Sequence, residues 1–151
     1  MDENKFLSEI EVRGDLTRDQ AYKVAVAVLQ ELHDRLSSKE ADHLAAQLPG
    51  ALKRMWHSLD APWRDVRRTH ERDFIRHIAD TVEIDEAKAH KSLMAAFKAL
   101  QMLLGSPSGQ EGVAWDVFSQ LPKDLKRIWL TSAGMAKPKA VKPRLGLSAR
   151  A

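Results

Sequence analysis

The 151-residue sequence contains no cysteine. Disulfide bonds, thiolate nucleophiles and cysteine-based metal sites are therefore excluded, which fits a reducing compartment. The first ten residues, MDENKFLSEI, lack a basic segment followed by an apolar one, so no secretory signal is predicted. The most apolar stretch, from Met94 to Leu104, is interrupted by Lys98 and Gln101 and is far shorter than the roughly 20 residues of a bilayer span. We accordingly expect a cytoplasmic protein that does not cross a membrane.

Strand patterns and catalytic motifs are missing as well. No segment alternates with period two, as a half-buried strand would. The sequence has no P-loop, no dinucleotide-binding glycine pattern, no nucleophile elbow and no metalloprotease helix. These absences argue against an enzyme and against a cofactor, although a fold can bring distant acids and bases together.

What the sequence does contain is an internal repeat. The segment QLPGALKRMW at residues 47–56 returns as QLPKDLKRIW at residues 120–129, with seven of ten positions identical. Upstream, FLSEI from Phe6 pairs with FIRHI from Phe74, and AYKVAVAVLQEL from Ala21 pairs with AHKSLMAAFKAL from Ala89. The offset between the copies changes from 68 to 73 residues, so five extra residues fall in the segment GSPSGQEG, which is interpreted as a loop.

Apolar residues recur three and four positions apart in both copies, which predicts an all-α helical bundle. Eight helices are predicted, near residues 3–12, 18–36, 39–48, 49–58, 62–82, 86–104, 111–121 and 122–132. Each four-helix repeat, residues 3–58 and 70–132, would bury too little apolar surface alone. We therefore expect both to pack about a pseudo-twofold axis in a single domain over residues 1–133.

Residues at the predicted helix ends agree with this interpretation. Thr17 and Asp85 occupy matched positions where a side chain can cap a helix N-terminus, and Ser37 is a further capping candidate. Pro49 and Pro122 lack an N–H, so each is expected at the first position of a helix.

Two repeated basic pairs are candidate interaction residues. Lys53 and Arg54 precede a tryptophan at 56, and Lys126 and Arg127 precede one at 129. Two such surfaces beside an aromatic ring would suit phosphate or an acidic partner. The simpler interpretation, which we favour, places the tryptophans in the core and the charges on the solvated face of an amphipathic helix.

A stripe of arginines lies between the repeats. Arg64, Arg68, Arg72 and Arg76 recur every four residues and would line one helix face that an acidic partner could contact. Acidic residues three or four positions away, such as Asp73, favour an ordinary surface of ion pairs instead.

The C-terminal segment is strongly basic. Lys137, Lys139, Lys142, Arg144 and Arg150 give the last fifteen residues a charge of +5 without an acid, which leaves residues 1–136 at 24 − 5 − 21 = −2. Residues 134–151 also contain spaced prolines and little apolar content, which predicts a disordered tail. Such a tail could give weak, salt-dependent affinity for nucleic acid.

Metal-site patterns are incomplete. The one Glu-x-x-His sequence is Glu40 to His43, and the second repeat has no counterpart, whereas a bundle di-metal site uses that pattern on two helices. His70, Asp73 and His77 share a helical face, but an exposed polar face explains them more simply. No metal site is predicted.

The segment HLAAQLPGALKRMW, followed by the second block QLPKDLKRIW, resembles the bacterial domain of unknown function 2267 family, whose members carry two such helical repeats. The resemblance covers residues 3–132. The connector HSLDAPW departs from the family pattern because it keeps Trp63 but has no glycine before it. The resemblance implies an all-α bundle and assigns no activity, substrate or cofactor.

These observations together favour a small, non-enzymatic helical binding or scaffolding protein that contacts a protein partner through its surface. The alternative is a weak, sequence-independent nucleic-acid-associated protein that acts through the basic tail. A pseudo-twofold core can be completed within one chain, so a monomer is expected.

Overall fold

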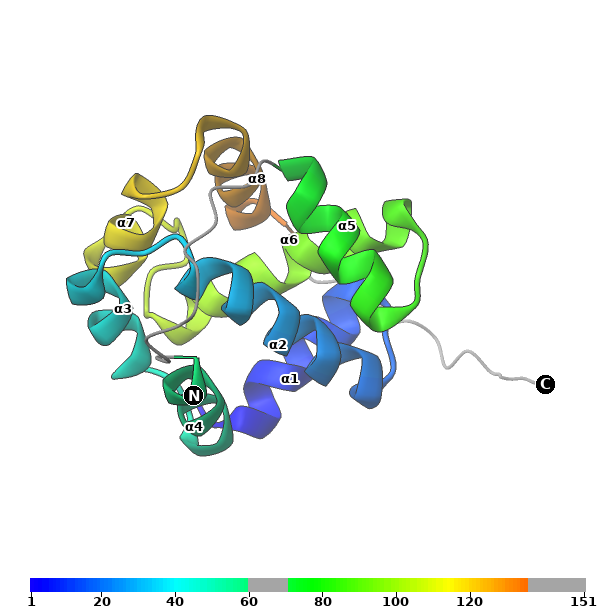
Figure 1. Ribbon diagram of the computed structural model, residues 1–151, viewed down its shortest axis with the longest axis horizontal. Helices are drawn as coiled ribbons and strands as arrows, with labels where there is room; N and C mark the ends of the chain where they lie inside the picture. The colour runs from blue at the N-terminus through cyan, green and yellow to red at the C-terminus, as the bar shows by residue number, and fades with distance from the viewer. Residues whose placement is uncertain (60–70, 136–151) are drawn as a thin grey trace.

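The computed structural model describes residues 1–59 and 71–135, and over these residues the protein is all-α (Figure 1). Within those two ranges lie eight helices and no strand. The helices are α1 (Glu3–Gly14), α2 (Arg18–His33), α3 (Ser38–Ala45), α4 (Gly50–Ser58), α5 (Glu71–Val82), α6 (Glu86–Leu103), α7 (Gly112–Ser119) and α8 (Lys123–Ala133). None of the helices in the described part is long and apolar enough to cross a membrane.

Two sequence predictions fall partly or wholly on other residues. The helix predicted for residues 62–82 is seen from Glu71 onward as α5, and its first part lies outside the described residues. The tail predicted for residues 134–151 is described only at Gly134 and Met135. Its predicted disorder therefore stays a prediction.

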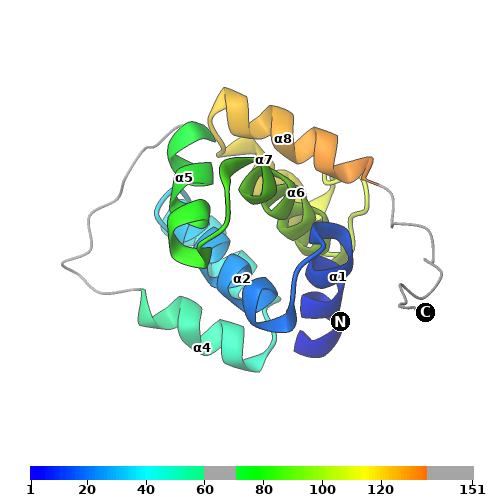
Figure 2. The same ribbon diagram turned by 90° about the vertical axis from the view of Figure 1, so that its right-hand side faces the viewer.

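The core is built around α1, α2, α5 and α6. Helix α1 packs against α2 and α6, α5 packs against the same two helices, and α2 and α6 contact each other. Helix α4 packs against α1 and α2, α8 packs against α6, and α3 packs against α7. Figures 1 and 2 show α4 and α8 on opposite sides of the central helices. The enclosed rings of Phe6, Phe74 and Phe97, each at most 1% exposed, fill the interior.

Matched helix ends in the two repeats have the same local structure. Thr17 accepts a hydrogen bond from the backbone N–H three residues further on (3.1 Å), and Asp85 does the same (2.8 Å). Ser37 caps α3 in this way as well (3.4 Å), so all three predicted caps are confirmed. The helices before these caps, α1 and α5, are each followed by a residue with positive φ, Asp15 at 56° and Glu83 at 63°.

The two repeated segments at residues 47–56 and 120–129, here called the Gln-Leu-Pro blocks, each follow the end of one helix and contain the start of the next. Pro49 and Pro122 are the N-caps of α4 and α8 and not their first helical residues, so each helix begins one residue later than predicted, at Gly50 and Lys123. The leucine before each proline donates its N–H to the carbonyl three residues back, at 3.1 Å in both blocks. This tighter turn forms because a proline disfavours the α conformation in the residue before it. Helices α3 and α7 consequently end at Ala45 and Ser119, earlier than predicted.

The end of α2 was also predicted too late, at residue 36 instead of His33. Ser37 must adopt an extended conformation (φ −65°, ψ 160°) to cap α3, so the helix before it has to stop. The N–H of Arg35 accordingly bonds the carbonyl of Leu32 (3.0 Å), which tightens the last turn. Leu36, three residues after the end of α2, packs against the core as a partly buried residue.

Lys98, which interrupts the most apolar stretch of the sequence, is only 9% exposed. Its Nζ donates to the carbonyl oxygens of Pro107 (3.1 Å) and Ala133 (2.8 Å). Arg13 also reaches this end of α8 and donates to the carbonyl of Met135 (2.9 Å). Burial lowers the pKa of Lys98, and the positive charge of Arg13 lowers it further.

We expect the free energy of unfolding to rise as the pH increases from the lowered pKa of Lys98 to the ordinary lysine pKa. Between these values the unfolded chain binds the Lys98 proton more than the folded chain does, so deprotonation favours folding. Lys98→Met removes this pH dependence. At neutral pH the variant is expected to lose about 1–3 kcal/mol, because two carbonyls lose their donor. Urea unfolding from neutral to alkaline pH measures both effects, and an identical pH dependence in parent and variant would contradict the assignment.

Candidate functional site

The two repeated basic pairs lie on opposite sides of the molecule. Lys53 and Arg54 belong to α4, and Lys126 and Arg127 belong to α8, so the pairs do not form one surface (Figures 1 and 2). In each pair the arginine is exposed and the lysine is half-buried. The tryptophans at 56 and 129 are 1% and 0% exposed. Their predicted place in the core is confirmed, and neither indole is open to a ligand.

Only part of the arginine stripe and of the tail can be placed. Arg72 and Arg76 are exposed on α5. The remaining candidates lie outside the described residues; they are Arg64, Arg68, Lys137, Lys139, Lys142 and Arg144. Their role in binding an acidic partner or nucleic acid stays a prediction.

An aromatic group on α7 accompanies the basic residues of α8. Trp115 is 46% exposed, and its ring lies 5.3 Å from that of Phe118, with 37° between the ring planes. Nζ of Lys126 lies 5.6 Å from the centre of the Phe118 ring, a cation–π contact that joins the two helices. Lys123 and Arg127, three positions before Lys126 and one after it on α8, are exposed. We call these five residues the α7–α8 surface.

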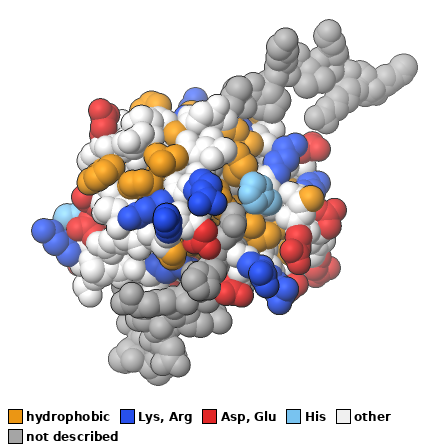
Figure 3. Space-filling model, turned by 90° about the horizontal axis from the view of Figure 1, so that it is seen from above, with side chains coloured by type: hydrophobic (Ala, Val, Ile, Leu, Met, Phe, Trp, Pro, Cys, Tyr) orange, Lys and Arg blue, Asp and Glu red, His pale blue; other side chains and the backbone are white. Residues whose placement is uncertain are grey.

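Figure 3 looks onto the molecule from above, the side on which α8 lies. Hydrophobic side chains are exposed next to lysine and arginine side chains on this face. Leu130, four residues after Lys126 on α8, is 42% exposed. The α7–α8 surface therefore combines an exposed indole, apolar area and positive charge.

Sequence reasoning did not select Trp115, because the repeat does not keep a tryptophan at this position. The matched position in the first repeat is Asp42, an exposed residue of α3. The available signal was that Trp115 lies off the apolar stripe of α7, to which Ala114 and Val117 belong. A tryptophan on the polar side of a short helix is a candidate contact residue.

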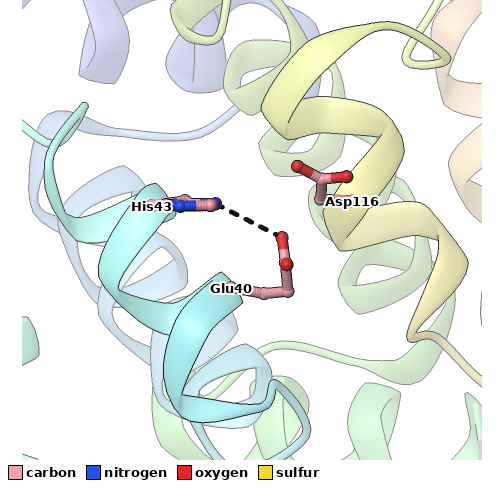
Figure 4. A group of neighbouring side chains, drawn as sticks. All are labelled: Glu40, His43 and Asp116. Carbon is pink, nitrogen blue, oxygen red and sulfur yellow. Dashed lines mark ion pairs between the residues drawn. The ribbon is translucent and has the colours of Figure 1, made fainter.

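A second group of side chains lies where α3 meets α7. Glu40 and His43 project from one face of α3, and Asp116 projects from α7 towards them (Figure 4). One ligand atom from each of the three residues lies within 4.8 Å of the others, and Oε2 of Glu40 is 3.6 Å from Nδ1 of His43. We call these three residues the α3–α7 cluster.

The members of this cluster differ in exposure. The side chain of Glu40 is 13% exposed and that of His43 is 44% exposed, while Asp116 is half-buried. Oε2 of Glu40 is buried and receives no hydrogen bond. The cluster therefore has a buried acceptor on its inner side and an imidazole open to solvent.

Hydrogen bonds between the repeats hold α3 and α7 in register. Oε1 of Gln120, just after α7, accepts from the backbone N–H of Ser37 (2.7 Å), and its Nε2 donates to Oγ of Ser37 (3.2 Å). Ser37 in turn caps the helix that carries Glu40 and His43. The first residue of the second Gln-Leu-Pro block thus positions the N-terminus of α3.

The sequence identified Glu40 and His43 but not Asp116. The second repeat has no Glu-x-x-His pattern that would have drawn attention to α7. Asp116 does occupy the position matched to His43 in the second repeat. The other candidate set gains no support, because His70 lies outside the described residues. No metal-competent group in the described part includes Asp73 or His77.

Comparison with known proteins places the chain in a family. No curated protein matches it significantly. A family model described as an uncharacterized conserved protein, DUF2267, matches residues 3–128, from the start of α1 into α8. This range contains most of both Gln-Leu-Pro blocks, whose sequences resemble that family. The chain therefore belongs to the DUF2267 family.

Proposed function

We propose that this protein is a non-enzymatic helical binding protein that recognises a protein segment through the α7–α8 surface. The observation that carries the proposal is the 46% exposure of Trp115. Tryptophan is among the residues that contribute most to binding energy at protein interfaces, and charged rims around such anchors add specificity. Trp115 provides the anchor, and Lys123, Lys126 and Arg127 provide the charge.

The charges beside Trp115 indicate the chemistry of the partner. Lys123, Lys126 and Arg127 favour a segment with acidic side chains next to an apolar anchor residue. Glu111 is exposed one helical turn before Trp115, and Asp116 follows it. A phosphate backbone carries charge along its whole length, so it would meet these carboxylates as well as the basic residues. A protein segment can place an apolar residue on Trp115 and acidic side chains over Lys123, Lys126 and Arg127 only. An acidic, amphipathic protein segment therefore fits the surface better than nucleic acid does.

The prediction is that Trp115→Ala weakens binding of such a segment by about 30-fold or more, the loss expected for an interface hot spot. Peptides selected from a random displayed library on the parent protein, and counter-selected on Trp115→Ala, should combine aspartate or glutamate with a large apolar residue. Their affinities can then be measured by fluorescence anisotropy. Tyr22→Ala is a matched control, because Tyr22 is 39% exposed but belongs to α2.

Two outcomes would oppose this proposal. Selected peptides that bind parent and Trp115→Ala equally would place the contact on another surface. Selection of peptides with no acidic residues would contradict the assigned partner chemistry.

The alternative function is weak binding of nucleic acid through the basic tail. It is supported by the uneven charge, +5 in the last fifteen residues against −2 in the rest. A labelled random-sequence DNA duplex should then bind the full chain in a salt-dependent way and should not bind a 1–133 truncation. Binding that survives the truncation would rule out the tail.

We further propose that the repeats form a single domain, residues 1–133, about a pseudo-twofold axis in a monomer. Supporting contacts occur in matched sets: α1 packs on α6 as α5 does on α2, and α2 packs on α4 as α6 does on α8. The matched pairs α2 with α6 and α3 with α7 also contact each other, as helices near such an axis would. Light scattering should give a mass near 17.0 kDa, and twice that value would indicate exchange of halves between two chains.

A further inference from the structure

Beyond this binding role, we propose that Glu40, His43 and Asp116 bind a divalent transition-metal ion, with Zn²⁺ as the preferred ion, across the junction of α3 and α7. Two carboxylates and one imidazole are ligands that Zn²⁺ accepts in proteins. Three protein ligands leave the fourth position of a tetrahedral site for water or for a side chain of a partner. The ligands come from both repeats, so the ion would link them.

The spacing of the ligand atoms fits such an ion. Zn²⁺ binds nitrogen and oxygen at about 2.0–2.1 Å, which places the ligand atoms of a tetrahedral site roughly 3.4 Å apart. Oε2 of Glu40 and Nδ1 of His43 are 3.6 Å apart, and the atom offered by Asp116 lies within 4.8 Å of both. Glu40 and His43 are one helical turn apart, so a small rotation of the exposed His43 and of Asp116 completes the geometry.

A buried, unsatisfied oxygen distinguishes this cluster from an ordinary surface ion pair. Oε2 of Glu40 is buried without a hydrogen-bond donor, since its ion-pair partner, Nδ1 of His43, lies 3.6 Å away, and a second carboxylate, that of Asp116, faces it from α7. Buried acceptors normally have a partner, and two carboxylates brought together repel each other. A divalent cation bound between them satisfies the oxygen and neutralises both charges.

The backbone around the cluster is held in place before any ion binds. Gln120 bonds both the backbone N–H and the hydroxyl of Ser37, which fixes the start of α3 against the end of α7. Glu40 and His43 follow Ser37 within the first two turns of α3. Asp116 lies four residues before Gln120 on α7. Ligands on fixed helices lose little conformational freedom on binding, which favours affinity.

The experiment titrates Zn²⁺ into the tag-free, full-length chain after treatment with a chelator, with calorimetry as the readout. One Zn²⁺ per chain is expected. Glu40→Gln, His43→Gln and Asp116→Asn should each weaken binding at least tenfold. Asp42→Asn and His57→Gln are matched controls outside the cluster and should leave the affinity unchanged.

Two further measurements identify the site independently. Bound Co²⁺ should give the intense visible absorption of a tetrahedral ion and should quench indole emission, and Trp115→Phe should reduce the quenching because Trp115 adjoins Asp116. The melting temperature of the parent should rise with Zn²⁺, and that of His43→Gln should not. Since His43 is 44% exposed, this variant is expected to fold normally, which circular dichroism checks.

Two results would overturn the proposal. Absence of Zn²⁺ binding at micromolar concentrations would show that the cluster is a solvated group of charges. Stoichiometric binding that all three substitutions leave unchanged would place the ion elsewhere. Neither result bears on peptide binding by the α7–α8 surface, because Trp115→Ala tests that surface without metal.

Discussion

Replacing Gly109 by alanine is expected to lower the free energy of unfolding by about 2–5 kcal/mol. Gly109 has a φ of +71°, a left-handed conformation that costs a residue with a Cβ about 1–2 kcal/mol. A Cβ at this position would also lie 2.5 Å from Nε1 of Trp129 and 2.8 Å from Nε2 of Gln101. Overpacking of a core site adds about 1–3 kcal/mol.

The two neighbours of Gly109 cannot move aside without further loss. Nε1 of Trp129 donates to the carbonyl of Gly109 (2.8 Å), and Nε2 of Gln101 donates to the carbonyl of Trp129 (3.0 Å). Both bonds are buried, so breaking either leaves a buried polar atom without a partner. The full overpacking cost is therefore expected to contribute to the loss in the free energy of unfolding.

Gly105→Ala is the matched control for this prediction. Gly105 has the same φ, +71°, but a Cβ there would meet nothing within 4 Å. The control is expected to lose only the conformational part, about 1–2 kcal/mol. Urea unfolding followed by circular dichroism measures both variants. Equal losses would show that the contact with Trp129 and Gln101 does not matter.

The structure assigns this loop a role that its sequence did not reveal. The segment GSPSGQEG was interpreted as an insertion in a turn, which is where extra residues are tolerated. In the fold its carbonyls at Pro107 and Gly109 accept from Lys98 and Trp129. Oγ of Ser106, which is 1% exposed, accepts from the N–H of Glu111. The loop that contains the insertion therefore stabilises the second repeat, because its backbone carbonyls accept hydrogen bonds from the buried Trp129 and from Lys98.

Features set by local chemistry were predicted well from the sequence. Thr17, Ser37 and Asp85 cap helices because a short polar side chain reaches a backbone N–H three residues away. The ends of α2 and α3 were predicted too late, because the apolar spacing continues past both of them. The cap at Ser37 and the proline at 49 stop these helices earlier. A helix end is therefore less predictable where the start of the next helix sets it.

The candidate sites depended on contacts that are distant in the sequence. Asp116 joins Glu40 and His43 only because α3 packs against α7, and Phe118 joins Lys126 only because α7 folds back beside α8. The offset of 73 residues pairs His43 with Asp116, but matched positions meet only where their helices pack together, as α3 and α7 do. The matched helices α4 and α8 lie on opposite sides of the central helices, so the repeat alone did not indicate which matched residues would meet.

The tryptophans of the two Gln-Leu-Pro blocks occupy matched positions in the sequence and are both buried, but their neighbours differ. Trp56 contacts the ring of His33 at 4.9 Å, whereas Trp129 receives a hydrogen bond from Gln101 on its backbone carbonyl. His33 and Gln101 are matched positions, 68 residues apart, so the same site in each repeat supports the tryptophan. Gly109 in the inserted loop gives Trp129 an additional acceptor.

Trp129→Ala is expected to lower the free energy of unfolding by about 3–5 kcal/mol, because it removes a fully buried ring and leaves a cavity. Trp129→Phe keeps most of the ring's contact with Phe97 but leaves the carbonyl of Gly109 without its donor, so a loss of about 1–3 kcal/mol is expected. Trp115→Ala removes a half-exposed ring and should lose about 1 kcal/mol or less.

Urea unfolding of these three variants separates the two contributions of Trp129. The difference between the phenylalanine and alanine variants measures packing against the core, and the loss in the phenylalanine variant measures mainly the bond to Gly109. If that bond connects the inserted loop to the core, the double variant Gly109→Ala/Trp129→Phe should lose less free energy of unfolding than the two single variants lose in sum. Strict additivity would mean that the loop and the tryptophan stabilise the second repeat independently.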